Sequence, residues 1–202
     1  MPDGNGAGAG GPAHAPDPGR EPGPEVVLEP MSGRHLDDVL RIEEELYPTP
    51  WSRNLFESEL TKRSTRAYYV ASVGGRVHGY GGVLIAGDEA HIATVAVESS
   101  VQRRGLAKRI LLHLTAVALD RGATLATLEV RADNGAAQRL YAGFGYMPVG
   151  VRKGYYVVDG ERVDAVIMTA HDIDTAGYEA RLVAIAETLP GVTRVEPDLP
   201  PA

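Results

Sequence analysis

The fold of this chain is decided by the stretch TVAVESSVQRRGLAKRILLHL, residues 94–114. Its first residues complete a short apolar run, 92–97, that is rich in β-branched side chains and predicts a buried strand. Its last residues carry Leu106, Ile110 and Leu114 at helical spacing, which predicts a helix that begins near Arg104. A short polar loop separates the two, so the stretch predicts a strand, a tight turn and a helix.

The turn between this strand and this helix has the features of an anion site. The first N–H groups of a helix have no internal partner, and the helix dipole adds partial positive charge there. Gly105 and Ala107 keep the backbone accessible, and Arg103, Arg104 and Lys108 add positive charge. The motif is neither a Walker loop nor GxGxxG. On this motif alone, an ordinary strand–helix turn with solvated arginines explains the residues equally well.

Composition excludes several classes of protein. The formal net charge is −7, which argues against a nucleic-acid binder and favours cationic partners such as amines, although an acidic surface also serves solubility alone. The absence of cysteine excludes disulfides, thiolate metal ligands and a thiol nucleophile. Apolar runs are shorter than a membrane span needs, and the first residues lack the basic and apolar regions of a signal peptide, so we expect neither feature. We therefore expect a cytoplasmic protein, monomeric or weakly dimeric, that binds neither nucleic acid nor membranes.

The chain divides into three parts. Residues 1–24 consist mainly of Gly, Pro, Ala and Asp, and we expect them to be disordered. Residues 25–171 carry the signals of one folded domain. In residues 172–202, Tyr178, Leu182 and Ile185 recur at helical intervals, which predicts an amphipathic helix followed by a Pro-rich tail. That helix covers either the sheet or a partner.

Hydrophobic periodicity and turn signals give the order of elements within the domain. We expect a strand, two helices, three antiparallel strands, the long helix, a strand, a shorter helix and two final strands. Gly79, Gly81 and Gly82 lie in one of the antiparallel strands and indicate a bulge or a close approach by another group. The predicted fold class is therefore α/β (α+β), with a mixed, mostly antiparallel sheet flanked by helices.

Several motifs resemble those of a known family. Gln102, Gly105 and Ala107 form a Q-x-x-G-x-A pattern that resembles the pyrophosphate loop of the GCN5-related N-acetyltransferases (GNAT), and the order of elements is similar to that fold. In addition, LEVRADNGAAQRLYAGFGY (128–146), VRKGYY (151–156) and PWS (50–52) resemble RimI-type ribosomal-protein alanine N-acetyltransferases. The resemblance covers roughly residues 26–170. It implies that the strand before the loop and the next strand splay apart around the acyl chain.

Acetyl transfer from a thioester to an amine requires a proton acceptor, donors for the oxyanion and a proton donor for the thiolate. Glu129 is the candidate base, because a carboxylate within an apolar strand carries a desolvation cost unless it has a partner or a task. An ion pair with Arg131 on an exposed face explains Glu129 about equally well. Tyr141 is the candidate acid, and a core tyrosine is the commoner alternative. The resemblance assigns these residues the same two roles.

The resemblance implies that acetyl-CoA is the co-substrate and that no metal is involved. On a splayed strand, amides 95–97 would be free to bind the pantetheine arm and to polarise the thioester carbonyl. Asn134 either caps its own helix or also bonds that arm. The residues expected to hold acetyl-CoA are Val95, Ala96, Val97, Arg103, Arg104, Gly105, Leu106, Ala107, Lys108 and Asn134.

The resemblance also implies a substrate. Similar proteins acetylate the N-terminal alanine of ribosomal protein eighteen of the small subunit, and Tyr155 and Tyr156 would help to form the pocket for the peptide end. Transfer would be direct, in a ternary complex. Two alternatives remain open: acetylation of a small amine (a polyamine or an aminoglycoside) or of protein lysines, and a non-enzymatic acyl-CoA sensor.

Overall fold

The computed structural model describes residues 23–158 and 160–197. The tail predicted to be disordered, residues 1–24, lies outside the described residues except for its last two.

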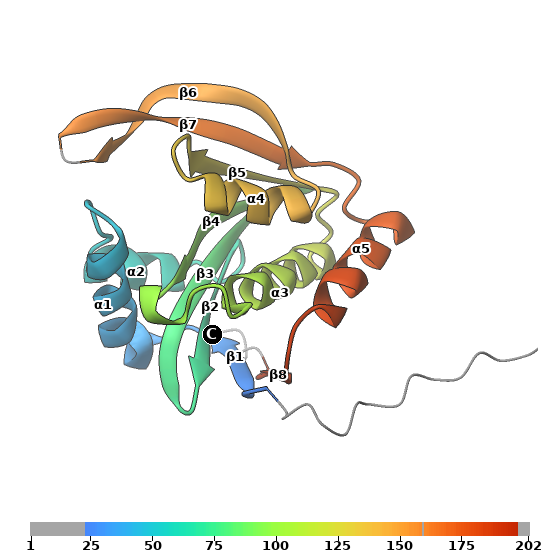
Figure 1. The fold of residues 1–202 in the computed structure, drawn as a ribbon, viewed down its shortest axis with the longest axis horizontal. Helices are drawn as coiled ribbons and strands as arrows, with labels where there is room; N and C mark the ends of the chain where they lie inside the picture. Colours follow the sequence, from blue (N-terminus) through green and yellow to red (C-terminus); the bar gives the residue numbers. More distant parts are fainter. Residues whose placement is uncertain (1–22, 159, 198–202) are drawn as a thin grey trace, which may run out of the picture.

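One eight-stranded sheet, in the order β6-β7-β5-β4-β3-β2-β1-β8, forms the centre of the molecule (Figure 1). Its strands are β1 (Val26–Pro30), β2 (Arg66–Val73), β3 (Arg76–Ala86), β4 (Glu89–Val97), β5 (Leu125–Arg131), β6 (Met147–Val158), β7 (Glu161–Ala170) and β8 (Thr193–Val195). The α-helices are α1 (Leu36–Leu46), α2 (Arg53–Leu60), α3 (Leu106–Asp120), α4 (Gly135–Gly143) and α5 (Ala176–Glu187). This architecture confirms the predicted fold class; the long helix begins at Leu106, two residues later than the spacing predicted.

The helices cover both faces of the sheet, because successive side chains on a strand point to opposite faces. On β2, Tyr69 and Ala71 belong to the core that α3 completes with Ile110 and Leu114. The alternate residues of β2 pack instead in a second core with α1 and α2, whose buried members are Met31, Leu36, Val39, Ile42, Phe56, Tyr68, Val70, Val77, Tyr80 and Ala96. The central strands are therefore held from two sides.

The two parallel central strands, β4 and β5, pair only at their beginnings. Their register joins residues 89–91 to residues 125–127 and goes no further. Beyond these residues β4 continues alongside β3 and β5 continues alongside β7. The strands therefore part toward their carboxyl ends, as expected for the splayed pair.

The glycines of β3 allow α3 to approach the sheet closely. A Cβ atom on Gly81 would lie 2.5 Å from Cγ2 of Ile110 and 3.0 Å from Cδ1 of Leu114. On Gly82 it would lie 2.2 Å from the ring of Tyr68. The close approach predicted from the sequence is present, and the register of β3 and β4 also shifts between Gly82 and Val83.

Replacing Gly81 with alanine should therefore destabilise the protein. The added methyl group forces α3 away from β3, and overpacking of this kind costs about 1–3 kcal/mol of unfolding free energy. Urea titration followed by circular dichroism measures the change. Gly177→Ala is the control, because a Cβ there meets nothing within 4 Å. If both variants unfold at the same urea concentration as the wild type, the packing argument is wrong.

The segment after β7 packs onto the domain. Helix α5 lies against α3 (Figure 1), and β8 adds to the sheet as a parallel neighbour of β1. Arg109 of α3 is only 3 % exposed and donates hydrogen bonds to the Pro190 carbonyl oxygen and to Oγ1 of Thr193. The side chain of Leu189 reaches Gly105 at the start of α3. This segment therefore contacts the turn that the sequence identifies as an anion site.

Candidate active site

The basic turn leads from β4 to α3 through a short 3₁₀ helix, Ser99–Val101. Arg103 and Gly105 adopt left-handed backbone conformations, with φ of 62° and 85°. Gln102 secures the turn by donating from Nε2 to the Val97 carbonyl oxygen at 3.0 Å. The N-cap of α3 is Gly105, which has no side chain to cap the helix. The first N–H groups of α3 therefore remain available to an anionic ligand.

The backbone N–H groups of β4 next to this turn point alternately to the two neighbouring sides of the strand. The N–H of Glu98 donates to the His78 carbonyl oxygen of β3 at 2.9 Å. Since N–H groups alternate in direction along a strand, that of Ala96 also points to β3, whereas those of Val95 and Val97 point to the side where β5 has parted. Two of the three amides predicted to bind the coenzyme thus face the opening.

A cleft of about 450 Å³ occupies the space between the parted strands. Of the candidate residues, Val95, Glu129, Asn134, Tyr141, Tyr155 and Tyr156 line it. Further lining comes from Glu43 of α1, from the connection of α1 to α2, and from the start of α4. Ala96 and Val97 lie beyond this lining, at the end of β4. Arg103, Arg104 and Gly105 follow in the turn, and Leu106, Ala107 and Lys108 form the start of α3. The cleft and the turn are thus joined by one strand.

Glu129 reaches the cleft from β5, and its side chain is 15 % exposed. One carboxylate oxygen accepts a hydrogen bond from Arg152 at 2.7 Å, and the other lies 3.2 Å from Nε2 of His91. The partner considered from the sequence, Arg131, forms an ion pair with Asp133 at 2.6 Å. Glu129 is therefore a paired carboxylate at the edge of the cleft, held by strands β4 and β6.

Tyr141 enters the cleft from α4 and is 8 % exposed. Burial, followed by the nearby phenols of Tyr47 and Tyr156, raises the pKa of Tyr141 well above its ordinary value. Burial also raises the pKa of Tyr156 to about 12. The Tyr156 hydroxyl donates to the Glu129 carbonyl oxygen at 3.0 Å. Both phenols therefore remain protonated at neutral pH and are able to donate.

Asn134 has the local role predicted for it. Its Oδ1 accepts a hydrogen bond from the Ala137 N–H at 3.0 Å and caps α4. The side chain is also exposed and lies in the lining of the cleft. Capping thus leaves the amide nitrogen of Asn134 available for a ligand.

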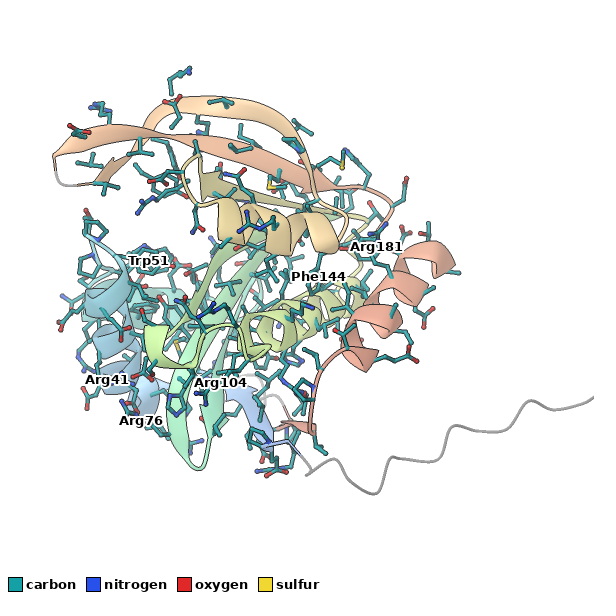
Figure 2. All side chains as sticks on the ribbon, viewed as in Figure 1. Arg41, Trp51, Arg76, Arg104, Phe144 and Arg181 are labelled. Carbon is teal, nitrogen blue, oxygen red and sulfur yellow. The ribbon has the colours of Figure 1, made fainter. Side chains whose placement is uncertain are left out.

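Sequence reasoning missed Glu43, Tyr47 and Arg152. Glu43 is 3 % exposed and accepts a hydrogen bond from the Trp51 N–H at 2.7 Å. Figure 2 shows Trp51 at the end of α1 and α2 that lies toward the β6–β7 hairpin. The sequence does contain one indication of Glu43. It lies four residues after Val39, on the apolar face of α1, where burial of a carboxylate is costly.

The site combines a cleft that holds a carboxylate and a buried phenol, strand amides that face the opening, and, at the end of the same strand, a helix N-terminus for an anion. These are the groups that acyl transfer from a thioester requires. The sequence model of the acetyltransferase (GNAT) family matches residues 36–146. The chain belongs to this family of N-acetyltransferases, which use acetyl-CoA.

Within the family, the chain is similar to RimI-type enzymes. The [ribosomal protein bS18]-alanine N-acetyltransferase of Escherichia coli K12 is 33 % identical over 142 residues, which cover 70 % of this chain and 95 % of that protein. The N-alpha-acetyltransferase RimI of Mycobacterium tuberculosis is 39 % identical over 116 residues, 55 % of this chain and 70 % of that protein. The crystal structure of the Escherichia coli ribosomal-protein-S18-alanine N-acetyltransferase superposes with a TM-score of 0.67 at 28 % identity, covering 73 % of this chain and 94 % of that one.

The described helices and the described His, Asp and Glu side chains show two further properties. None of the helices within residues 23–158 and 160–197 combines the length and apolar character that a membrane span requires. The same residues contain no group of three or more His, Asp or Glu side chains placed to hold a metal ion.

Proposed function

We propose that this protein transfers the acetyl group of acetyl-CoA to the N-terminal α-amine of a protein, with the N-terminal alanine of ribosomal protein bS18 as substrate. The observation that carries the proposal is the cleft between the parted strands β4 and β5, lined by Glu129 and Tyr141. The names of the relatives supply the choice of substrate. The α1–α2 connection and β6 both line the cleft, and the chain end of the substrate would enter between them.

The residues present fit acetyl-CoA. The diphosphate would bind the first N–H groups of α3, beside the exposed guanidinium groups of Arg103 and Arg104. The amides of Val95 and Val97 would hold the pantetheine arm as an added strand does, with Asn134 across the cleft. Acetyl-CoA supplies the activated acetyl group, and the chain holds it at the opening.

Glu129 and Tyr141 would move the protons. Glu129 accepts a proton from the ammonium group of the substrate, directly or through a water molecule. Tyr141 stays protonated because its pKa is raised, and it holds a proton for the departing thiolate. The transfer would be direct, since the chain contains no cysteine to carry the acetyl group.

The peptide would enter between the α1–α2 connection and β6. Tyr155 is 47 % exposed, and the guanidinium carbon of Arg152 lies 4.4 Å from the centre of its ring. Tyr156 is partly buried beside it, with ring centres 5.0 Å apart. These two rings and Trp51 line the cleft, and they would form the apolar walls around the first residue of the peptide.

The test mixes the purified protein with acetyl-CoA and a peptide of the bS18 N-terminal sequence, and follows thiol release. Turnover with the free α-amine, and none with the same peptide already acetylated at its N-terminus, is expected. Spermidine and a lysine-containing peptide with a blocked N-terminus form the comparison arms. Turnover confined to either of these would replace the proposed substrate, and absence of turnover in every arm would refute the proposed activity.

A further inference from the structure

Glu43 is unusual among the buried carboxylates of this protein. Of the side chains that the structure describes, two carboxylates are buried, Glu43 at 3 % exposure and Glu98 at 8 %. Glu98 has three basic partners: Arg41 at 3.0 Å, Arg76 at 3.2 Å and His78 at 2.6 Å. Glu43 forms no ion pair with any described residue, and its hydrogen-bond donor is a single backbone N–H, that of Trp51. A buried carboxylate without a counter-charge is costly, because burial removes its hydration.

The other carboxylate of the cleft, Glu129, already has a counter-charge, the guanidinium group of Arg152. Both oxygens of Glu129 are occupied, one by Arg152 and the other by His91. Glu43 lines the same cleft. Among the described residues of the cleft lining, Glu43 and Glu129 are the carboxylates, and Glu43 is the one without a counter-charge that an entering cation would meet. The α-ammonium group of a peptide is such a cation at neutral pH, since its pKa is about 7.7–8.0.

We propose that Glu43 is the residue that binds the ammonium group of the incoming substrate, and so selects a free amine at the cleft. The inference rests on the proposed function, because it takes the occupant to be a peptide N-terminus. Glu43 would act in binding and Glu129 in proton transfer. The backbone N–H of Trp51 would hold the carboxylate of Glu43 in place and couple it to the wall of the peptide entrance.

The environment of Glu43 gives this binding a pH dependence. Burial raises the pKa of Glu43 to about 7, and the Trp51 N–H partly opposes the shift. As pH falls through 7, Glu43 becomes neutral and loses its attraction for an ammonium group. Among the residues that the structure describes, the titratable groups that share the cleft with it are Tyr47, Glu129, Arg131, Tyr141, Tyr155 and Tyr156.

Steady-state kinetics of Glu43→Gln test the proposal. The amide oxygen of glutamine can still accept from the Trp51 N–H, so the wall keeps its hydrogen bond while the charge is lost. We expect the KM for the bS18 peptide to rise about tenfold or more, with kcat and the KM for acetyl-CoA nearly unchanged. Glu44→Gln, an exposed neighbour on α1, should behave as the wild type. Between pH 7.5 and pH 6, the peptide KM should rise for the wild type and stay flat for Glu43→Gln.

The outcomes separate this inference from the proposed function. If the wild type acetylates the peptide and Glu43→Gln does so with an unchanged peptide KM, the role of Glu43 is refuted and the activity stands. A drop in kcat without a change in peptide KM would move Glu43 into proton transfer and equally refute the binding role. If the wild type turns over no peptide, both proposals fall. Glu43→Asp, which keeps the charge, should recover part of the peptide affinity and guards against a folding defect.

Discussion

Replacing Glu129 with glutamine is expected to lower kcat for acetyl transfer about 10²–10⁴-fold. Glutamine has the size of glutamate, and its single amide oxygen can still accept from Arg152, but it does not take up a proton at neutral pH. The KM for acetyl-CoA should stay close to that of the wild type, because the residues proposed to hold the diphosphate are untouched. Initial rates of thiol release, measured across a range of pH, give both constants.

Glu89→Gln is the matched control for that variant. Glu89 lies on the neighbouring strand β4, accepts a hydrogen bond from Thr127 at 3.0 Å, and lies outside the lining of the cleft. Its replacement should leave kcat unchanged. A Glu129→Gln enzyme that keeps kcat within about twofold of the wild type would remove Glu129 from proton transfer.

Replacing Tyr141 with phenylalanine is expected to lower kcat about 10²-fold or more, again with little effect on the KM for acetyl-CoA. The ring stays in the core, but the departing thiolate loses its proton donor. The effect should be smaller with a donor whose thiol is more acidic, because that thiolate leaves without help. Measuring the variant with acetyl-CoA and with such a thioester therefore tells whether the lower kcat comes from the missing proton donor or from altered packing of the ring.

Tyr146→Phe is the control for Tyr141→Phe. The two rings are neighbours, with centres 5.9 Å apart. The Tyr146 hydroxyl is buried and, within the part of the chain that the structure describes, has no hydrogen-bond partner. Its removal should leave kcat unchanged and should not lower stability. Equal losses of activity in both variants would show that Tyr141 acts through packing alone.

The sequence was sufficient for most of the fold. The strand–turn–helix at residues 94–114 and the glycines of β3 are local patterns, and the structure confirms both the elements and the close approach. It was insufficient for β8. Thr193–Val195 is too short to show a period, and it becomes a strand only because β1 offers an unpaired edge and Arg109 secures the chain beside it.

The residues of the candidate site could likewise be predicted from the sequence only in part. Glu129 and Tyr141 stand out because each is marked within its own element and by the family motif. Their neighbours are not marked, because Tyr47, His91 and Arg152 come from three segments that only the tertiary fold brings together. The amides of β4 show the same limit: the sequence places residues 95–97 on the strand, but the pairing with β3 decides which N–H groups face the opening.

A crystal structure of the protein with acetyl-CoA tests the central claim most directly. We expect the diphosphate on the N–H groups at the start of α3, the pantetheine arm beside Val95 and Val97, and the acetyl group between β4 and β5, in reach of Tyr141. A coenzyme bound elsewhere on the protein, or β4 and β5 paired along their full length in the complex, would contradict the account.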